Sequence, residues 1–265
     1  MPCPRQIEVV IIIIKLYQFK IILTDLSKYK LDLLINNNNI HSLLFTMKVL
    51  SVNVGLPRKV LFNGQSVTTG IFKNPIKEPV MVRKLNLDGD RQADLTVHGG
   101  VDKAVYSYPK EHYSYWRNQF SSLDFVWGMF GENFTTEGLM EDDINIGDQF
   151  QIGSAKLVAT QPRMPCYKLG VKFGTMEIIR RFLSSGRSGI YFKVLEEGEV
   201  QLGDEIKIIK RDKNNVTVKD IVNLYNSNDI EHNIETMKRA IKVESLPEGW
   251  RYDLQKNLDQ LQSDQ

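Results

Sequence analysis

Cysteine is scarce in this sequence of 265 residues, which holds only Cys3 and Cys166. Two cysteines cannot build a disulfide framework, and only one lies beyond residue 46, so we expect a reducing, cytoplasmic compartment. No Cys-x-x-Cys pair occurs, and the few histidines are scattered, which opposes a structural zinc site. The Gly-x-x-x-x-Gly-Lys-Ser/Thr phosphate loop and the Gly-x-Ser-x-Gly elbow are also missing, so neither of those enzyme classes is indicated.

The sequence also has no large excess of either basic or acidic residues. The net charge is +2, and residues 1–46 account for it with five bases and three acids, which leaves 29 of each in the rest of the chain. Nucleic-acid binding depends mainly on phosphate neutralisation, so a neutral body predicts no nucleic-acid partner. Every uncharged apolar stretch is far shorter than the roughly 18–20 residues that span a bilayer, so no membrane partner is expected.

The first 46 residues differ from the remainder. The run Val9–Ile14 is β-branched throughout, and Asn36–Asn39 is of low complexity, whereas Met47 opens an alternating strand. We therefore expect residues 1–46 to be a disordered extension, or sequence upstream of a true start at Met47. A peripheral membrane anchor is the alternative, opposed by few aromatic residues and no clear amphipathic face.

Short strands separated by turns dominate residues 47–212. The pattern predicts strands over 48–54, 80–87, 104–108, 148–152, 155–160, 190–195 and 205–210. Helices are predicted from Pro109 to about Phe120, and from a Thr175 cap to Leu183 with Gly186 beyond its end. Regular alternation of strand and helix is absent, so we expect a mainly β domain resembling a barrel, closed or nearly closed.

Beyond a polar linker at residues 211–216, the apolar period changes to that of helices. Thr217 and Asp220 form a capping-box pattern, Asp229 is a second cap, and Pro247 opens a third helix. We predict a three-helix domain over 216–262. From Asn214 onward it holds six bases and nine acids, which opposes a DNA-binding helix-turn-helix and favours an interaction or dimer-packing module.

The loop around Cys166 is the clearest candidate for a reactive or metal-binding site. Pro162 and Pro165 stiffen the chain around Cys166, while Arg163 and Lys168 flank it with positive charge. Nearby cations favour the thiolate, which is a soft metal ligand or a nucleophile. A buried structural cysteine is the plain alternative.

Two other segments add candidate binding groups. In the first, paired Gly99 and Gly100 can turn backbone N–H groups toward an anion, with donors from neighbouring Arg91, His98 and Lys103. A loop with solvated charges explains that segment equally well.

The second segment is a turn at residues 130–135. Its Asn133 could hydrogen-bond a ring amide, although the turn alone is a weak signal. Spacing alone also leaves open a hydrolase that pairs Cys166 with His98 or His112.

Five motifs in series resemble the MOSC domain family, and their order and spacing resemble its bacterial YiiM-like branch. They are Gly89–Asp94, His98–Ala104, Tyr108–Tyr113, Gly131–Phe134 and Pro162–Leu169. The tail from about Val216 is similar to the three-α-helix domain that follows MOSC in that branch. The resemblance covers about residues 47–260.

The resemblance implies a β-barrel-like domain that binds the molybdenum cofactor, in which molybdenum is held by a pterin dithiolene with a phosphate tail. It implies that Cys166 ligates the metal and acts in catalysis. Basic side chains and turn amides would then hold pterin and phosphate; the expected residues are Arg91, His98, Gly99, Gly100, Lys103, Asn133, Arg163 and Lys168. The pyridoxal-phosphate domain of some relatives is missing here, so no pyridoxal phosphate is expected.

The activity implied is reduction of N-hydroxylated compounds, such as hydroxylaminopurine-type base analogues or amidoximes. The sequence shows no flavin or haem motif, so a separate flavoprotein-type electron donor is expected. The sequence also leaves open whether the protein forms a homodimer. The alternative is a non-catalytic carrier of the cofactor or of activated sulfur on Cys166. A third hypothesis is an adaptor that acts through its helical tail.

Overall fold

The structure, a computed structural model, describes residues 46–93, 99–226 and 233–263. The chain divides into two compact units, residues 1–43 and 44–265. The predicted extension over residues 1–46 lies, apart from Thr46, outside the described residues. The fold below is that of the second unit.

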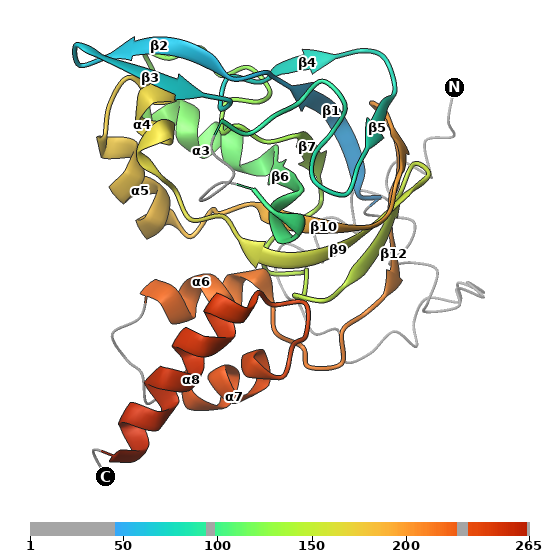
Figure 1. The fold of residues 1–265 in the computed structure, drawn as a ribbon, viewed down its shortest axis with the longest axis vertical. Coiled ribbons are helices and arrows are strands. Elements are labelled where there is room, and N and C mark those ends of the chain that lie inside the picture. The colour runs from blue at the N-terminus through green and yellow to red at the C-terminus, as the bar shows by residue number, and fades with distance from the viewer. Residues whose placement is uncertain (1–45, 94–98, 227–232, 264–265) are drawn as a thin grey trace, which may run out of the picture. The chain divides into compact units, whose positions relative to one another are not determined.

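A mixed sheet of eight strands, in the order β12-β8-β9-β10-β6-β7-β1-β4, forms the centre of this unit (Figure 1). All its neighbouring strands run antiparallel except β6 and β7, which run parallel. The strands are β1 (Lys48–Val54), β4 (Asn74–Ile76), β6 (Val105–Pro109), β7 (Phe134–Glu137), β8 (Gln149–Ile152), β9 (Ala155–Pro162), β10 (Ile190–Glu196) and β12 (Ile206–Lys210).

The sheet does not close into a barrel, which corrects the barrel-like prediction. The segment before β12 approaches the start of β1 at one isolated bridge between Lys48 and Glu205, where Val49 N donates to Asp204 O over 2.9 Å. Farther along β1, residues 52–54 pair with β4. A strand has only two hydrogen-bonding edges and β7 occupies the other, so β12 cannot extend along β1 and the sheet stays open.

Two small ribbons accompany the sheet. One pairs β2 (Arg58–Phe62) with β3 (Gln65–Thr69), and the other pairs β5 (Val80–Val82) with β11 (Gly198–Val200). The strand predicted over 80–87 is therefore too long. It ends at Val82 because the chain turns back and bridges Val82 to Leu87.

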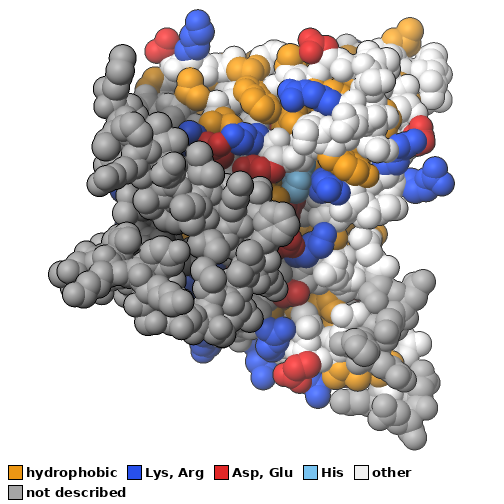
Figure 2. All heavy atoms as spheres, turned by 180° about the vertical axis from the view of Figure 1, so that it is seen from behind, with side chains coloured by type: hydrophobic (Ala, Val, Ile, Leu, Met, Phe, Trp, Pro, Cys, Tyr) orange, Lys and Arg blue, Asp and Glu red, His pale blue; other side chains and the backbone are white. Residues whose placement is uncertain are grey.

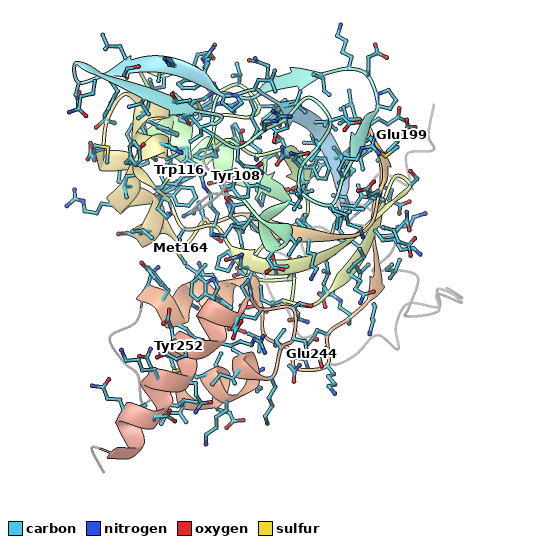
Figure 3. The ribbon with its side chains drawn as sticks, viewed as in Figure 1. Tyr108, Trp116, Met164, Glu199, Glu244 and Tyr252 are labelled. Atoms are coloured by element: carbon cyan, nitrogen blue, oxygen red, sulfur yellow. The ribbon has the colours of Figure 1, made fainter. Side chains whose placement is uncertain are left out.

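Three helices gather on one flank of the sheet around an aromatic core: α3 (Glu111–Gln119), α4 (Tyr167–Phe173) and α5 (Glu177–Ser185). The predictions of α3 and α5 are confirmed, whereas α4 is not anticipated by the sequence pattern. At the core, Trp116 Nε1 donates to the Tyr108 hydroxyl over 2.6 Å (Figure 3). The short helix η1 (Val101–Lys103) precedes β6.

Three further helices form the C-terminal tail: α6 (Val218–Asn226), α7 (Ile234–Ile241) and α8 (Glu248–Ser263). The capping box is confirmed, since Asp220 N donates to Thr217 Oγ1 over 3.0 Å and Thr217 N donates to Asp220 Oδ2 over 2.9 Å. The predicted cap Asp229 lies outside the described residues. The tail helices share one hydrophobic core with the sheet. None of the helices in the described ranges is long and apolar enough to cross a membrane.

The face opposite that of Figure 1 carries both signs of charge. In Figure 2, Lys and Arg side chains of the described residues lie among acidic and hydrophobic ones instead of merging into one basic area. This pattern fits the near balance of bases and acids in the sequence.

Candidate functional site

A cavity of about 100 Å³ lies beside Cys166, between the start of α4 and the loops that precede β6 and β7. We call it the thiol cavity. Seven of the residues predicted for the site line it: Arg91, Gly99, Lys103, Asn133, Arg163, Cys166 and Lys168. Folding therefore joins residues of four of the five motifs, up to 77 positions apart in the sequence.

Two predicted residues are not among those that line the thiol cavity in the described part of the chain. Gly100 lines a neighbouring cavity, and His98 lies outside the described residues. For these two, as for the seven that line the cavity, contact with a cofactor stays a prediction.

Cys166 sits at the junction of β9 and α4. Pro162, the last residue of β9, pairs with Ile190 of β10, which anchors the chain before the loop. Cys166 then caps α4, and its carbonyl accepts the Leu169 N–H over 2.9 Å. Its side chain is half-buried and is not part of a disulfide bond. Strand pairing on one side and a helix on the other thus hold the thiol at a defined place in the cavity wall.

Charge in the thiol cavity is strongly one-sided. Among the described lining residues, five are basic and none is acidic; the basic ones are Lys73, Arg91, Lys103, Arg163 and Lys168. Arg163 and Lys168 are 7% and 8% exposed, so solvent screens them little. Such a wall favours an anionic occupant.

Arg163 is held firmly as a cation. Its guanidinium donates to Phe130 O over 2.6 Å and lies over the rings of Tyr106 and Phe182, at 5.0 and 5.5 Å from their centroids. Burial works to lower the pKa of Arg163, but interactions with Tyr106, Tyr191 and Cys166 outweigh it and raise the pKa. The electrostatic link between Arg163 and Cys166 is the one that the sequence predicts for this loop.

The side chain of Asn133 forms more hydrogen bonds within the protein than the sequence indicates. Its Oδ1 accepts the Tyr106 N–H over 3.1 Å, and its Nδ2 donates to Asp90 Oδ2 over 2.9 Å. Asp90 in turn accepts the Gly55 N–H over 3.0 Å and pairs with Lys73. The side chain of Asn133 therefore links three segments of the cavity wall.

Sequence reasoning missed Lys73, Gln92, Tyr106 and Tyr191, all of which line the thiol cavity. Burial lowers the pKa of Lys73, although its partner Asp90 opposes the shift. The Gln92 side-chain oxygen is buried without a hydrogen-bond partner among the described residues. Gln92 lies inside the first motif and could have been chosen there, whereas Lys73 lies outside all five motifs and gave no signal.

A buried carboxylate organises the loop that supplies Gly131 and Asn133. Glu132 accepts the N–H groups of Gly128 and Phe130 over 2.9 and 3.0 Å, the Thr135 hydroxyl over 2.9 Å, and the Tyr113 hydroxyl. Burial raises the pKa of Glu132, although these hydrogen bonds oppose the shift. The turn at residues 130–135 is thus ordered by its glutamate.

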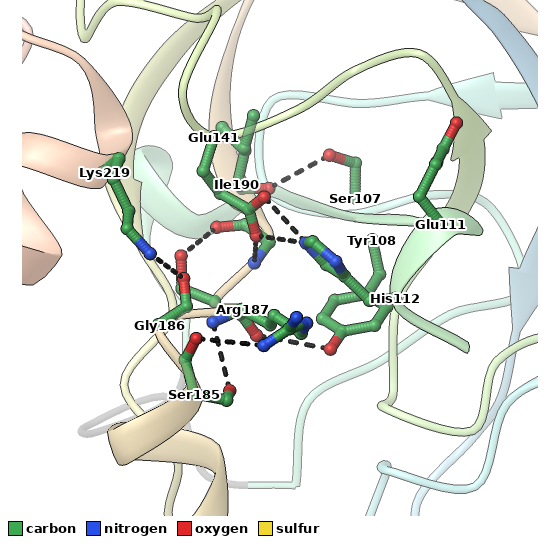
Figure 4. A network of polar contacts seen from close by, with 12 residues as sticks. Ser107, Tyr108, Glu111, His112, Glu141, Ser185, Gly186, Arg187, Ile190 and Lys219 are labelled. Atoms are coloured by element: carbon green, nitrogen blue, oxygen red, sulfur yellow. Dashed lines mark hydrogen bonds and ion pairs between the residues drawn. The ribbon is translucent and has the colours of Figure 1, made fainter. Parts of the chain in front are cut away.

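His112 belongs to another network (Figure 4). Its Nε2 lies 2.8 Å from Glu141 Oε2, and Glu141 Oε1 accepts the Gly189 N–H over 2.7 Å. Lys219 of α6 joins this network by donating its backbone N–H to Glu141 O and its ammonium to Gly186 O. His112 is absent from the thiol cavity lining, so of the two pairings proposed for a hydrolase only the one with His98 keeps any support.

Comparison with known proteins adds independent information. Residues 94–207 match the model of the MOSC domain. The chain is 40% identical to the "Uncharacterized protein YflK" of Bacillus subtilis over 80% of this chain and 95% of that protein. It is 33% identical to "Protein YiiM" of Escherichia coli, over 71% of this chain and 84% of that protein. A protein named "Reductase" from Gibberella moniliformis is 31% identical over 62% of this chain but 29% of its own length.

Solved structures agree with these matches. The crystal structure of YiiM from Geobacillus stearothermophilus has a TM-score of 0.66 and 33% identity, covering 80% of this chain and 99% of that one. The crystal structure of YiiM from Escherichia coli has a TM-score of 0.64 and 27% identity, over 82% and 94% of the two chains. The chain therefore belongs to the MOSC domain family. Within that family it falls in the YiiM-like branch.

MOSC domains are associated in general with molybdenum cofactor binding. Within the described ranges, no group of three or more His, Cys, Asp and Glu side chains is placed to hold a metal ion. A metal at Cys166 would therefore need most of its ligands from a bound cofactor.

Proposed function

We propose that the thiol cavity binds the molybdenum cofactor and that the protein reduces N-hydroxylated compounds. The observation that carries the proposal is the single half-buried thiol in a cavity whose described lining holds five basic and no acidic side chains. A soft metal suits a thiolate, and a phosphate suits buried cations. Membership of the MOSC family and the name of the fungal relative support the same reading.

The residues present fit such a group. The unpartnered oxygen of Gln92 can accept from an N–H or amino group of a pterin ring. Gly70 lets the segment after β3 pack directly against the segment of Arg91, because a Cβ there would lie 2.3 Å from Arg91 O. Lys103 and Lys168 would bind the phosphate, and Cys166 would ligate molybdenum.

When bound, the cofactor supplies a two-electron redox centre. Conversion of an N-hydroxy group to an amine consumes two electrons and two protons and releases water. Burial raises the pKa of Tyr191, so its phenol stays protonated near neutral pH and can donate a hydrogen bond into the cavity. The cationic wall would stabilise negative charge that develops on the leaving oxygen. Electrons would come from a separate flavoprotein-type donor.

The test uses protein produced in a host that makes the cofactor. We expect close to one molybdenum and one pterin per chain, and turnover of an amidoxime with a reduced viologen dye as electron donor. A cofactor carrier predicts the same loading without turnover, whereas a carrier of activated sulfur on Cys166 predicts neither molybdenum nor pterin. Protein free of molybdenum and pterin, from cells that load another molybdenum enzyme, would contradict the reductase and the cofactor carrier.

A further inference from the structure

A second and larger cavity, of about 820 Å³, lies against the thiol cavity. We call it the tail cavity because α6, α7 and α8 form one side of it, while residues 99–103 and Gln161 form the other. Gly99 and Lys103 line both cavities. A molecule in the tail cavity can therefore place one end close to the thiol cavity.

The wall of the tail cavity is tied to the loop that carries Cys166. Trp250 Nε1 on α8 donates to Gln161 Oε1 over 2.9 Å, and Gln161 immediately precedes Pro162. On the same strand, the Thr160 hydroxyl donates to Asp102 O over 2.7 Å, which anchors η1 beside it. The tail thus contributes a wall at a fixed position relative to the proposed reaction centre.

Two aromatic rings of the tail helices contact each other edge to face. Tyr225 of α6 and Trp250 of α8 have ring centroids 5.9 Å apart at an angle of 66°. Both line the cavity, and Tyr225 is 56% exposed even though an aromatic ring gains by burial. Exposed aromatic faces of this kind bind flat ring systems by stacking.

Charge distinguishes the tail cavity from the thiol cavity. Its described lining contains two acids, Asp102 and Asp253, and two bases, Lys103 and Lys256. Such a balance gives no preference for an anion, so the cofactor phosphate is not the occupant that this cavity favours. Its volume, its aromatic rings and its balanced charge together favour an uncharged, flat heteroaromatic ring.

We propose that the tail cavity is the site for the ring of the substrate, with Tyr225 and Trp250 as the residues that select flat aromatic N-hydroxy compounds over small aliphatic ones. This inference rests on the proposed function for its chemistry, but ring binding can be measured without turnover. Selection would then be a property of the C-terminal helices, while the chemistry belongs to the sheet and the Cys166 loop.

The experiment measures binding of 2-aminopurine, a fluorescent purine base, to the full chain. Tyr225→Ala should raise its dissociation constant by about fivefold to a hundredfold, the range for loss of one base–aromatic stack. Tyr252→Ala is the matched control, because Tyr252 is an exposed tyrosine of α8 that is absent from the cavity lining (Figure 3). Trp250→Phe keeps a ring and should have a smaller effect than Tyr225→Ala.

Steady-state kinetics of the cofactor-loaded protein then test the ring-binding site separately from the proposed reductase function. Tyr225→Ala should raise KM for an N-hydroxylated purine by a larger factor than KM for acetamidoxime, a small aliphatic substrate, whereas Tyr252→Ala should change neither. A 2-aminopurine dissociation constant within twofold of wild type in Tyr225→Ala overturns the ring site, whether or not the protein turns over. Equal weakening in Tyr252→Ala also overturns it. Weakened binding in Tyr225→Ala alone, in a protein that reduces nothing, supports the ring site and refutes the proposed function.

Discussion

The two neighbouring cavities are built on different principles. The thiol cavity is small, basic and lined by side chains held in buried hydrogen bonds, such as Asn133 and Arg163. The tail cavity is larger, balanced in charge and lined by helices with exposed aromatic side chains. Fixed cations suit an anionic group that remains bound, whereas exposed rings suit a neutral molecule that enters and leaves. The contrast is consistent with the proposed division of roles, in which the thiol cavity binds the cofactor and the tail cavity selects the substrate ring.

The largest effect should follow from a change at the thiol itself. Cys166→Ser should abolish reductase activity and leave the fold intact, because a hydroxyl is a harder, poorly ionised ligand of nearly the same volume. Activity with an artificial electron donor, molybdenum content and thermal unfolding should be measured together. Normal turnover at normal metal content in Cys166→Ser would refute the metal-ligand role of Cys166.

A change behind the thiol cavity should act on stability instead. Glu132→Ala removes the acceptor of two buried backbone N–H groups and of the Tyr113 and Thr135 hydroxyls. Buried donors without partners cost about 1–3 kcal/mol each, so the free energy of unfolding should fall by at least about 3 kcal/mol. Urea denaturation measures it.

Glu111→Ala is the comparison variant for Glu132→Ala. Glu111 is an exposed carboxylate that accepts the Gly138 N–H, and its loss should cost under about 1 kcal/mol. Similar losses in the two variants would contradict the organising role of Glu132.

The shared wall of the two cavities offers a sharper comparison. Lys103→Ala should weaken cofactor retention by about ten- to a hundredfold, because a charge-assisted hydrogen bond to an anion contributes roughly 1.5–3 kcal/mol. Arg163→Ala should weaken it similarly, with an added loss of stability from its bond to Phe130. Lys256 lines the tail cavity but not the thiol cavity, so the Lys256→Ala variant should retain the cofactor as well as the wild type does. Cofactor dissociation constants test all three, and values within twofold of wild type for both Lys103→Ala and Arg163→Ala would leave the cationic wall without a role.

The smallest expected effect concerns pH. Burial works to raise the pKa of Glu141, but the hydrogen bond and charge of His112, together with the backbone N–H of Gly189, outweigh it and lower the pKa. Stability from Glu141 should therefore be fully present above its ordinary pKa in the unfolded chain and be lost as pH falls below that value. Glu132 has a raised pKa, so its contribution has the opposite sign and stability falls as pH rises through the range above the ordinary value.

Unfolding free energies of wild type and Glu141→Gln between about pH 3 and pH 7 measure this dependence. Glu141→Gln should flatten the acid side of the curve. A curve parallel to that of the wild type would contradict the lowered pKa.

Much of the fold could be predicted because the signals are local. The capping box of Thr217 and Asp220, the Gly186 helix end and the hairpin around Gly153 depend on residues a few positions apart. Helix α4 could not be predicted, because its seven residues are too few to show a helical period. The open sheet could not be predicted either, since it depends on which strand takes the second edge of β1.

By itself, the sequence determined the motif segments, the one cysteine beyond residue 46 with its flanking cations and prolines, and the change to helical periodicity in the tail. Only the tertiary structure decided that Lys73 joins the cationic wall, that Asn133 bonds within the wall, and that His112 pairs with Glu141 away from the thiol. It also decided that the tail lies against the site through Trp250 and Gln161. The physical reason is distance along the chain: periodicity and turn chemistry report on neighbours in sequence, whereas these contacts join residues that only the packed sheet brings together.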